Sequence, residues 1–362
     1  MTYSRDTAHK GRGTGLNPAN RFFSTRSEPA DDGWASACDP SADAVSGPAT
    51  TVTVQRSRSI ISRNRSPDVP FAQSVNPYQG CEHGCIYCYA RPSHAYLDLS
   101  PGLDFETRLF AKPDAAALLR AELARPGYRV STINIGANTD PYQPVEREWR
   151  ITRALLEVML EYRHPVTLIS KNALILRDLD LLGELAGLGL VRVMISVTTL
   201  DAGLSRIMEP RASAPHRRLQ AISALRDAGV PVGVLMAPVI PFINDHELEQ
   251  VLEAVAGAGA DMAGYVLLRL PHELRELFTD WLRRHFPLRA ERVLQTLREA
   301  RGGRGNDARY GHRMRGEGVH ADLLAQRFRH ARRRWGLDGE RAALRGDLFR
   351  PPPPGGQMRL FN

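Results

Sequence analysis

The chain has 362 residues, a net charge of +8 at pH 7 and 43% hydrophobic residues, enough for one large α/β domain with extensions. No apolar run approaches the ~18 residues needed to span a bilayer, and residues 1–20 are polar without a hydrophobic signal region. The composition therefore argues against a membrane protein and predicts a cytoplasmic one with no membrane partner.

Residues 1–65 are rich in Ser, Thr, Asp, Gly and Arg and show little hydrophobic periodicity. Such composition predicts a largely disordered N-terminal arm. Cys38 lies in this arm and is interpreted as an incidental thiol.

Residues 66–300 alternate short apolar runs of strand length with amphipathic segments of helix length. The predicted strands are residues 74–78, 130–136, 165–170, 191–197, 230–237 and 262–268. The predicted helices are residues 113–125, 148–162, 178–186, 216–228, 245–256 and 272–285. Six strands alternating with helices indicate parallel βαβ units with right-handed crossovers. A six-stranded barrel and a doubly wound sheet both fit this order.

Three of the four cysteines, Cys81, Cys85 and Cys88, follow the first predicted strand with the spacing C-x3-C-x2-C. Such clustering is typical of soft-metal ligands rather than disulfides. A structural zinc site would need a fourth ligand, for which His83 or His94 is available. A cubic iron-sulfur cluster held by three cysteines instead keeps one iron free for a small molecule.

The spacing, with Tyr87 directly before the last cysteine, resembles the cluster motif of the radical SAM superfamily. The resemblance implies a [4Fe-4S] cluster on the three cysteines, with S-adenosyl-L-methionine bound at the open iron. It further implies reductive cleavage of that cofactor to a 5′-deoxyadenosyl radical and a partial (β/α)6 TIM-like barrel. A reductant such as flavodoxin or ferredoxin becomes an expected partner, and whether the cofactor is consumed or regenerated stays open.

Ligands of parallel α/β folds gather at the carboxyl ends of the strands, where this chain carries polar residues. By its position, the family resemblance assigns the cofactor's amino group to the segment after the second strand. The candidates there are Asn138, Thr139 and Asp140. Lys171, after the third strand, is placed to pair with the methionine carboxylate or with a substrate phosphate.

The fourth strand and its loop supply the remaining cofactor candidates. The resemblance assigns ribose contacts to Ser196 and Thr198 and an adenine contact to Tyr87. Glu209 and Arg211 lie at the same barrel mouth, where they either clamp the cofactor or pair with each other.

Residues Cys85 to Ala90, with Lys171 and Glu209 to Arg211, resemble the spore-photolyase-like branch, in particular an uncharacterised bacterial group within it. The named member of that branch splits a thymine dimer in DNA and returns a hydrogen atom through a cysteine outside the cluster motif. This chain has no cysteine after Cys88, which leaves Cys38, Tyr142 or Tyr265 as donors. We therefore expect a radical SAM enzyme that acts on nucleic acid in DNA repair or modification, with the lyase reaction and the base unspecified.

Residues 301–350 form a predicted basic helical extension with 13 arginines and 6 acidic residues. Phe328 and Trp335 are interleaved with arginines on a predicted helix over residues 319–335, a pattern that suits phosphate contact and base stacking. A solvated helical face and aromatic side chains packed against the domain are the alternatives.

Residues 351–362 form a predicted flexible tail that begins with a proline-rich spacer. Its end resembles the peptide by which bacterial polymerases and repair proteins dock on the replicative sliding clamp. Gln357, Leu360 and Phe361 match that peptide, and the two apolar residues would carry most of the affinity.

Two other functions fit parts of the sequence. One is a metal-stabilised adaptor for nucleic acid or the clamp without turnover, and the other is a radical SAM enzyme that modifies a peptide or tRNA. Polar residues at successive strand ends favour an enzyme over an adaptor.

Overall fold

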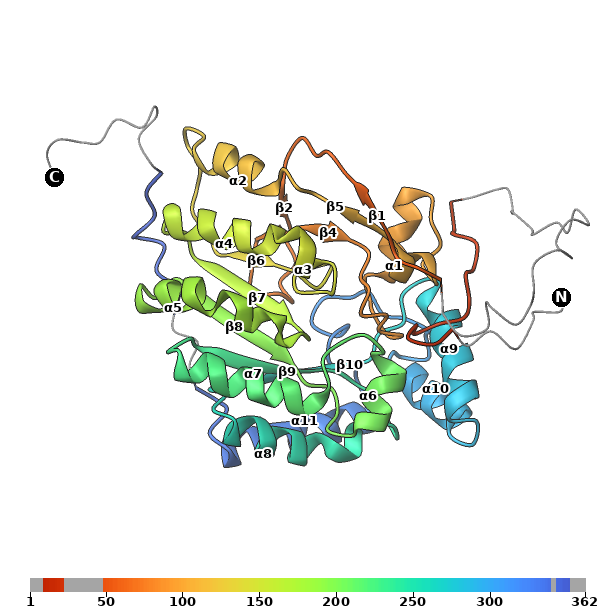
Figure 1. Cartoon of the computed structure of the whole chain (residues 1–362). Helices are drawn as coiled ribbons and strands as arrows, with labels where there is room; N and C mark the ends of the chain where they lie inside the picture. The colour runs from red at the N-terminus through yellow and green to blue at the C-terminus, as the bar shows by residue number, and fades with distance from the viewer. Residues whose placement is uncertain (1–8, 23–47, 340–342, 352–362) are drawn as a thin grey trace, which may run out of the picture.

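The computed structural model describes residues 9–22, 48–339 and 343–351. Its centre is a seven-stranded sheet with the order β10-β9-β8-β7-β6-β3-β2 (Figure 1). The edge strand β2 (Ile61–Arg63) is antiparallel to β3, and every other pairing in this sheet is parallel. The parallel strands are β3 (Gln73–Val75), β6 (Ile133–Ile135), β7 (Val166–Ser170), β8 (Val191–Ser196), β9 (Val232–Val239) and β10 (Met262–Leu267). The predicted six-stranded partial barrel is confirmed.

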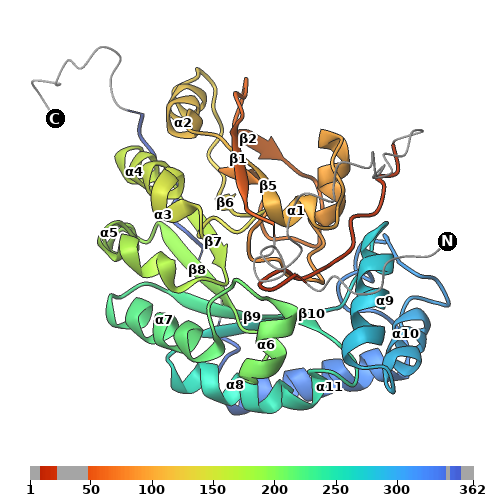
Figure 2. The same cartoon turned by 45° about the vertical axis from the view of Figure 1, so that its right-hand side comes forward.

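Helices cover the outer side of the curved sheet (Figure 2). The covering helices are α2 (Ala115–Leu123), α4 (Ile151–Glu161), α5 (Leu179–Gly187), α7 (Pro215–Asp227) and α8 (Leu248–Gly257). Short helical turns follow several strands: α3 (Glu146–Trp149), η3 (Ala173–Asp178), α6 (Ala202–Met208) and η4 (Asp245–Glu247). The central strands β6 and β8 are almost wholly buried, and most of their residues are apolar.

The segment that carries the cysteines is held by a second, smaller sheet of order β1-β5-β4. Its strands are β1 (Thr51–Val54), β5 (Arg108–Ala111) and β4 (Tyr78–Gln79). Beside it lie η2 (Arg91–Leu97) and α1 (Asp104–Thr107). The cysteine loop leaves β4 at Gly80, which has a positive φ of 77° that favours glycine.

The prediction of a largely disordered arm over residues 1–65 is wrong for its described parts. Residues 48–65 contain β1 and β2, and residues 9–22, here called the strap, lie against the body near α1 and α9 (Figure 2). Arg12 donates to the Glu106 carbonyl (2.9 Å), and the Leu16 carbonyl accepts from the Leu103 N–H (3.0 Å). These contacts are made largely by polar and backbone groups, so hydrophobic periodicity does not reveal them.

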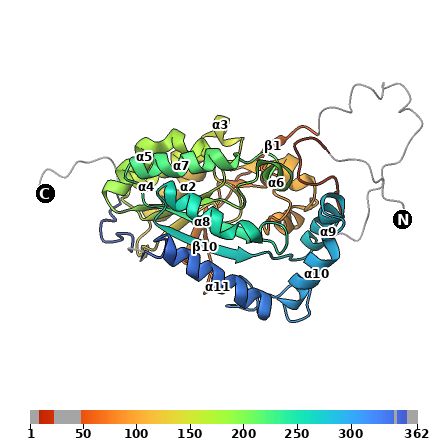
Figure 3. The ribbon, with the colours of Figure 1, turned by 90° about the horizontal axis from the view of Figure 1, so that it is seen from below.

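The C-terminal region completes the barrel instead of standing apart from it. It contains α9 (Leu274–His285), α10 (Ala290–Glu299) and α11 (Val319–Arg334), and α11 lies along β10 and α8 (Figure 3). Phe328 is buried, with its ring centre 4.6 Å from that of Tyr265. The idea that Phe328 stacks on bases is therefore wrong, because its ring packs against the domain.

Loops bridge the two edges of the open barrel. On the β10 side, the Leu267 N–H donates to the Met314 carbonyl (2.9 Å). On the β2 side, Asp68 accepts from the Gly311 N–H (2.7 Å) and pairs with Arg313. Within the described residues, no helix is long and apolar enough to cross a membrane.

Candidate cofactor site at the carboxyl ends of the strands

The cysteine loop, residues 81–88, is a buried turn fixed at both ends by backbone hydrogen bonds. The Cys81 N–H donates to the Phe105 carbonyl (2.9 Å), and the Ile86 N–H donates to the Met208 carbonyl (3.0 Å). Cys81 and Cys85 are buried, and Cys88 is half-buried. The three cysteines are thus held on one preformed loop.

The surroundings of the cysteines disfavour free thiolates and would favour thiolates that bind a positively charged metal cluster. Burial, together with the negative charges of Asp140 and of the other two cysteines, raises the pKa of Cys81 well above its ordinary value. Burial and then the charge of Glu209 raise the pKa of Cys85. Thiolates crowded in this way need a cationic group between them, and the irons of a cluster supply one.

A zinc site fits less well at His83, both of whose ring nitrogens are engaged, whereas His94 keeps a buried Nδ1 without a hydrogen-bond partner among the described residues. His83 Nδ1 lies 3.4 Å from Asp140 Oδ2, and its Nε2 lies 3.1 Å from Asn172 Nδ2. His94 Nε2 lies 2.9 Å from the Arg108 carbonyl oxygen. Across the residues the structure describes, no three His, Cys, Asp or Glu side chains converge on a point that would suit a single metal ion. A cubic cluster has no such requirement, because each cysteine binds a different iron.

A fully buried arginine, Arg91, donates hydrogen bonds to backbone carbonyls of the cysteine loop. Arg91 donates from Nε to the Cys85 carbonyl (2.9 Å) and from Nη2 to the Gly84 carbonyl (3.0 Å). It also pairs with the buried carboxylate of Glu106, which accepts from the Gly13 N–H of the strap (2.8 Å). Arg91 therefore links the cysteine loop, α1 and the strap.

Thr139 and Asp140, after β6, contact the loop directly. Thr139 Oγ1 donates to the Gly80 carbonyl (2.7 Å). Asp140 accepts from the Lys171 N–H (2.8 Å) and from Ser170 Oγ (2.8 Å) and lies beside His83. Burial opposes ionisation of Asp140, but His83 and the N–H groups of Lys171 and Tyr142 outweigh it and lower its pKa to about 2.

Asn138 and Gln143, in the same segment after β6, bond to residues next to the cysteine loop or within it. The Asn138 N–H donates to Asn76 Oδ1 (2.8 Å), and its side chain donates to Ser93 Oγ (3.2 Å). Gln143, absent from the sequence candidates, is buried and accepts from the Glu82 N–H (2.8 Å). It also donates to the Gly80 carbonyl (3.2 Å), so it bridges the start of the loop.

Glu209 is the centre of a buried network below Tyr87. Its carboxylate accepts from the Tyr87 hydroxyl and from Thr198 Oγ1, the latter at 2.8 Å, and pairs with Arg218 of α7. Arg218 also donates to the Ser196 carbonyl (3.0 Å). Tyr87, Ser196 and Thr198 are therefore brought together, as expected, by an acid and a base that join three elements.

The alternative in which Glu209 pairs with Arg211 is wrong. Arg211 Nη1 instead lies 2.8 Å from Glu82 Oε1, and the Arg211 N–H donates to the His83 carbonyl (3.3 Å). Sequence reasoning missed Arg218 as the partner because nothing distinguishes it from the other arginines of this chain.

Lys171 lies over the ring of Tyr87, with Nζ 5.8 Å from the ring centre. Its charge also acts on Cys85, where it opposes the rise in pKa. Tyr142 and Glu146 do not join the site. Tyr142 is buried and donates to Asp178 (3.1 Å), while Glu146 pairs with Arg177.

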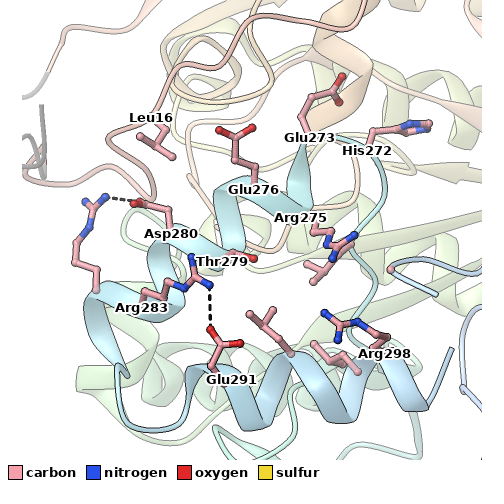
Figure 4. A pocket seen from close by; sticks show the side chains of 15 residues that line it. Leu16, His272, Glu273, Arg275, Glu276, Thr279, Asp280, Arg283, Glu291 and Arg298 are labelled. Carbon is pink, nitrogen blue, oxygen red and sulfur yellow. Dashed lines mark hydrogen bonds and ion pairs between the residues drawn. The ribbon is translucent and has the colours of Figure 1, made fainter. Parts of the chain in front are cut away.

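A surface groove of about 930 Å³ lies between α9, α10 and Leu16 of the strap (Figure 4). No residue of the cysteine loop lines it. Ion pairs cross its surface, among them Arg283 with Glu291, drawn in Figure 4. The groove is therefore separate from the cofactor site.

In the comparison with protein families, residues 75–255 match the model of the radical SAM superfamily. The chain belongs to that superfamily. Radical SAM proteins use a [4Fe-4S] cluster and S-adenosyl-L-methionine.

Uncharacterised proteins of a bacterium and an archaeon are similar to this radical SAM protein in sequence. An uncharacterised protein of Mycobacterium tuberculosis is 38% identical over 232 residues, which cover 64% of this chain and 68% of the relative. An uncharacterised protein of Methanocaldococcus jannaschii is 24% identical over 173 residues, which cover 48% and 62%.

The solved structures that resemble the chain include two of spore photoproduct lyase. A variant of that enzyme is 14% identical, with a TM-score of 0.56 and coverage of 79% of this chain and 80% of its own. The complex with dinucleoside spore photoproduct is 15% identical, with a TM-score of 0.55 and coverage of 78% and 79%. At this identity the likeness is one of fold.

Proposed function

We propose that this radical SAM protein is an enzyme that acts on nucleic acid, in repair or modification of a base. The observation that carries the proposal is two exposed tyrosine rings, one directly after the cysteine loop and one beside an arginine. Tyr89, directly after Cys88, is 57% exposed, and Tyr310 is 58% exposed with the Arg313 guanidinium 4.8 Å from its ring centre. Exposed rings beside arginines are what proteins use to stack bases and contact phosphates.

The proposed roles of the site residues are those that the resemblance to the radical SAM superfamily implies. Cys81, Cys85 and Cys88 would bind the cluster, which when bound supplies the electron that cleaves S-adenosyl-L-methionine. Asn138, Thr139 and Asp140 would bind the cofactor's amino group, Lys171 its carboxylate, Ser196 and Thr198 its ribose, and Tyr87 its adenine. Arg211 would order the loop through Glu82 and the His83 carbonyl.

Neither described donor candidate of the sequence analysis is free to return a hydrogen atom in the photolyase route. Tyr142 is buried and bonded to Asp178, and Tyr265 is packed against Phe328. Cys38 lies outside the described residues. For that reason the proposal stops at a radical reaction on nucleic acid and does not name a lyase step.

The tail carries a second, separate proposal. Gln357, Leu360 and Phe361 lie outside the described residues, and the peptide they form would tether the enzyme to the sliding clamp. Deletion of residues 357–362 should abolish capture by immobilised clamp and leave cofactor cleavage intact. Equal capture of the truncated chain would refute the tether.

The first experiment tests turnover. The chain is reconstituted anaerobically with iron and sulfide, then given S-adenosyl-L-methionine and dithionite, flavodoxin or ferredoxin, and 5′-deoxyadenosine is measured with and without nucleic acids. Stimulation by a DNA or an RNA would support the proposal. Stimulation only by a peptide would favour peptide modification, and bound zinc without deoxyadenosine would favour the adaptor.

Two variants test the cluster assignment in the same preparation. Cys85→Ala should lose most of the bound iron, whereas Cys38→Ala should keep it. Full iron content in Cys85→Ala would overturn the ligand set. A thiolate-bound cluster of this kind also suits the reducing cytoplasm, where we place the enzyme.

A further inference from the structure

Arg269 lies just beyond the end of β10, at the carboxyl end of the sheet. Its side chain is half-buried, and its buried Nε has no hydrogen-bond partner among the described residues. The contact found for its guanidinium is with a sulfur atom, Nη1 lying 3.7 Å from Met314 Sδ. A desolvated guanidinium without an oxygen acceptor is unfavourable, so a missing acceptor is to be expected there.

Two neighbouring arginines, Arg301 and Arg313, have oxygen acceptors for their guanidinium groups. Arg301 donates to the carbonyls of Leu267 and Leu268 and also to two carbonyls of the 304–316 loop. Arg313 pairs with Asp68. Arg269 stands apart from both, because no acid or carbonyl of the described structure accepts from it.

The surroundings of Arg269 favour an anion. Burial and then the charge of Arg313 lower the pKa of Arg269, and Asp68, the nearest acid, is already bonded to Arg313 and to the Gly311 N–H. A ligand with two or more anionic oxygens would relieve this excess of positive charge, and a phosphate matches the fork of the guanidinium.

The position of Arg269 also connects it to the cofactor site. Burial raises the pKa of Tyr89, and Arg269 is near enough for its positive charge to oppose that rise; the Tyr89 hydroxyl donates to the Ala137 carbonyl after β6. Tyr89 follows Cys88 directly, so a group bound at Arg269 lies beside an exposed ring next to the cysteine loop. Lys171, at the end of β7, lies by Tyr87 instead.

We propose that Arg269 binds a backbone phosphate of the nucleic-acid substrate and so holds the adjoining nucleotide against Tyr89. This rests on the proposed function and names the group through which the substrate is anchored. Arg269 is a substrate-positioning residue in this scheme and takes no part in cofactor cleavage.

The test compares Arg269→Gln and Arg269→Lys with Arg298→Gln, which removes the same charge from an exposed position on α10. Binding of a labelled single-stranded oligonucleotide to the reconstituted enzyme is measured by fluorescence anisotropy over a range of salt. Arg269→Gln should raise Kd about tenfold and lower the slope of log Kd against log salt by about 0.7, the value for one phosphate contact. Arg269→Lys should fall between, since it keeps the charge and loses the fork.

Arg298→Gln should stay within about twofold of the unmodified chain. A second probe, the same oligonucleotide with one neutral methylphosphonate linkage, should bind the unmodified chain more weakly and Arg269→Gln no more weakly than the charged probe. Equal effects of Arg269→Gln and Arg298→Gln would overturn the proposal, as would binding of carboxylate-bearing peptides but no oligonucleotide. Deoxyadenosine stimulation, measured separately, shows whether the proposed function itself fails.

Discussion

Gly13 of the strap lies so close to Gly84 of the cysteine loop that a Cβ atom on Gly13 would be 1.7 Å from the Gly84 carbonyl oxygen. The Gly13 N–H donates to Glu106, the partner of Arg91. Strap and loop therefore meet at a point where no side chain fits, next to Cys85.

Gly13→Ala should displace the strap and expose the cluster. Forcing a methyl group into such a contact costs about 1–3 kcal/mol. The reconstituted variant should lose its cluster absorbance in air several times faster than the unmodified chain. Gly187→Ala is the matched control, because a Cβ there meets no atom within 4 Å. Equal decay of the two variants would show that the strap does not shield the cluster.

Arg91→Gln should destabilise the protein strongly, because it leaves Glu106 buried without its cation. The expected loss in free energy of unfolding is about 3–5 kcal/mol, measured by chemical denaturation before iron is added. The control is Arg283→Gln, which breaks the exposed pair with Glu291 and should cost less than about 1 kcal/mol. Similar losses in both variants would contradict the role given to Arg91.

Glu209→Gln should weaken cofactor binding more than Tyr87→Phe does. The first change removes the charge that Arg218 needs and disturbs both Tyr87 and Thr198, whereas the second removes one hydroxyl. Loss of one hydrogen bond costs about 1 kcal/mol, or about fivefold in Kd. Equilibrium binding of S-adenosyl-L-methionine to the reconstituted variants gives the comparison, and equal values would place Glu209 outside the cofactor site.

Stability should fall between about pH 6.5 and pH 4 because of His164. Burial lowers its pKa to about 4, while the Tyr128 hydroxyl lies 2.9 Å from its Nε2. In that window the unfolded chain binds more protons than the folded one, so the free energy of unfolding decreases as the pH falls and is fully restored above about pH 6.5. Denaturation at several pH values should show a shallower dependence in His164→Gln. Some pH dependence of the free energy of unfolding should remain in His164→Gln, because burial also lowers the pKa of His94 to about 4.

The barrel could be predicted from sequence because buried strands of mainly apolar residues alternate with amphipathic helices, as in α5 and β8. The cysteine loop was predictable from spacing alone. Thr139 and Asp140 were found because strand ends converge in parallel folds.

Other parts of the site leave no such trace in the sequence. Arg91 and Arg218 look like any arginine in an arginine-rich chain until the fold buries each beside one acid. The strap binds through glycine, backbone and polar contacts, which have no period that composition or alternation would reveal.

The strap also sets an order for assembly during synthesis. Gly13 bonds to a residue 93 positions later in the chain, and Arg21 pairs with Glu273, 252 positions later. A ribosome releases the cysteine loop long before α9, and chains fold from the N-terminus as they emerge. The strap therefore cannot complete its contacts until α9 has been synthesised, long after the cysteine loop has left the ribosome.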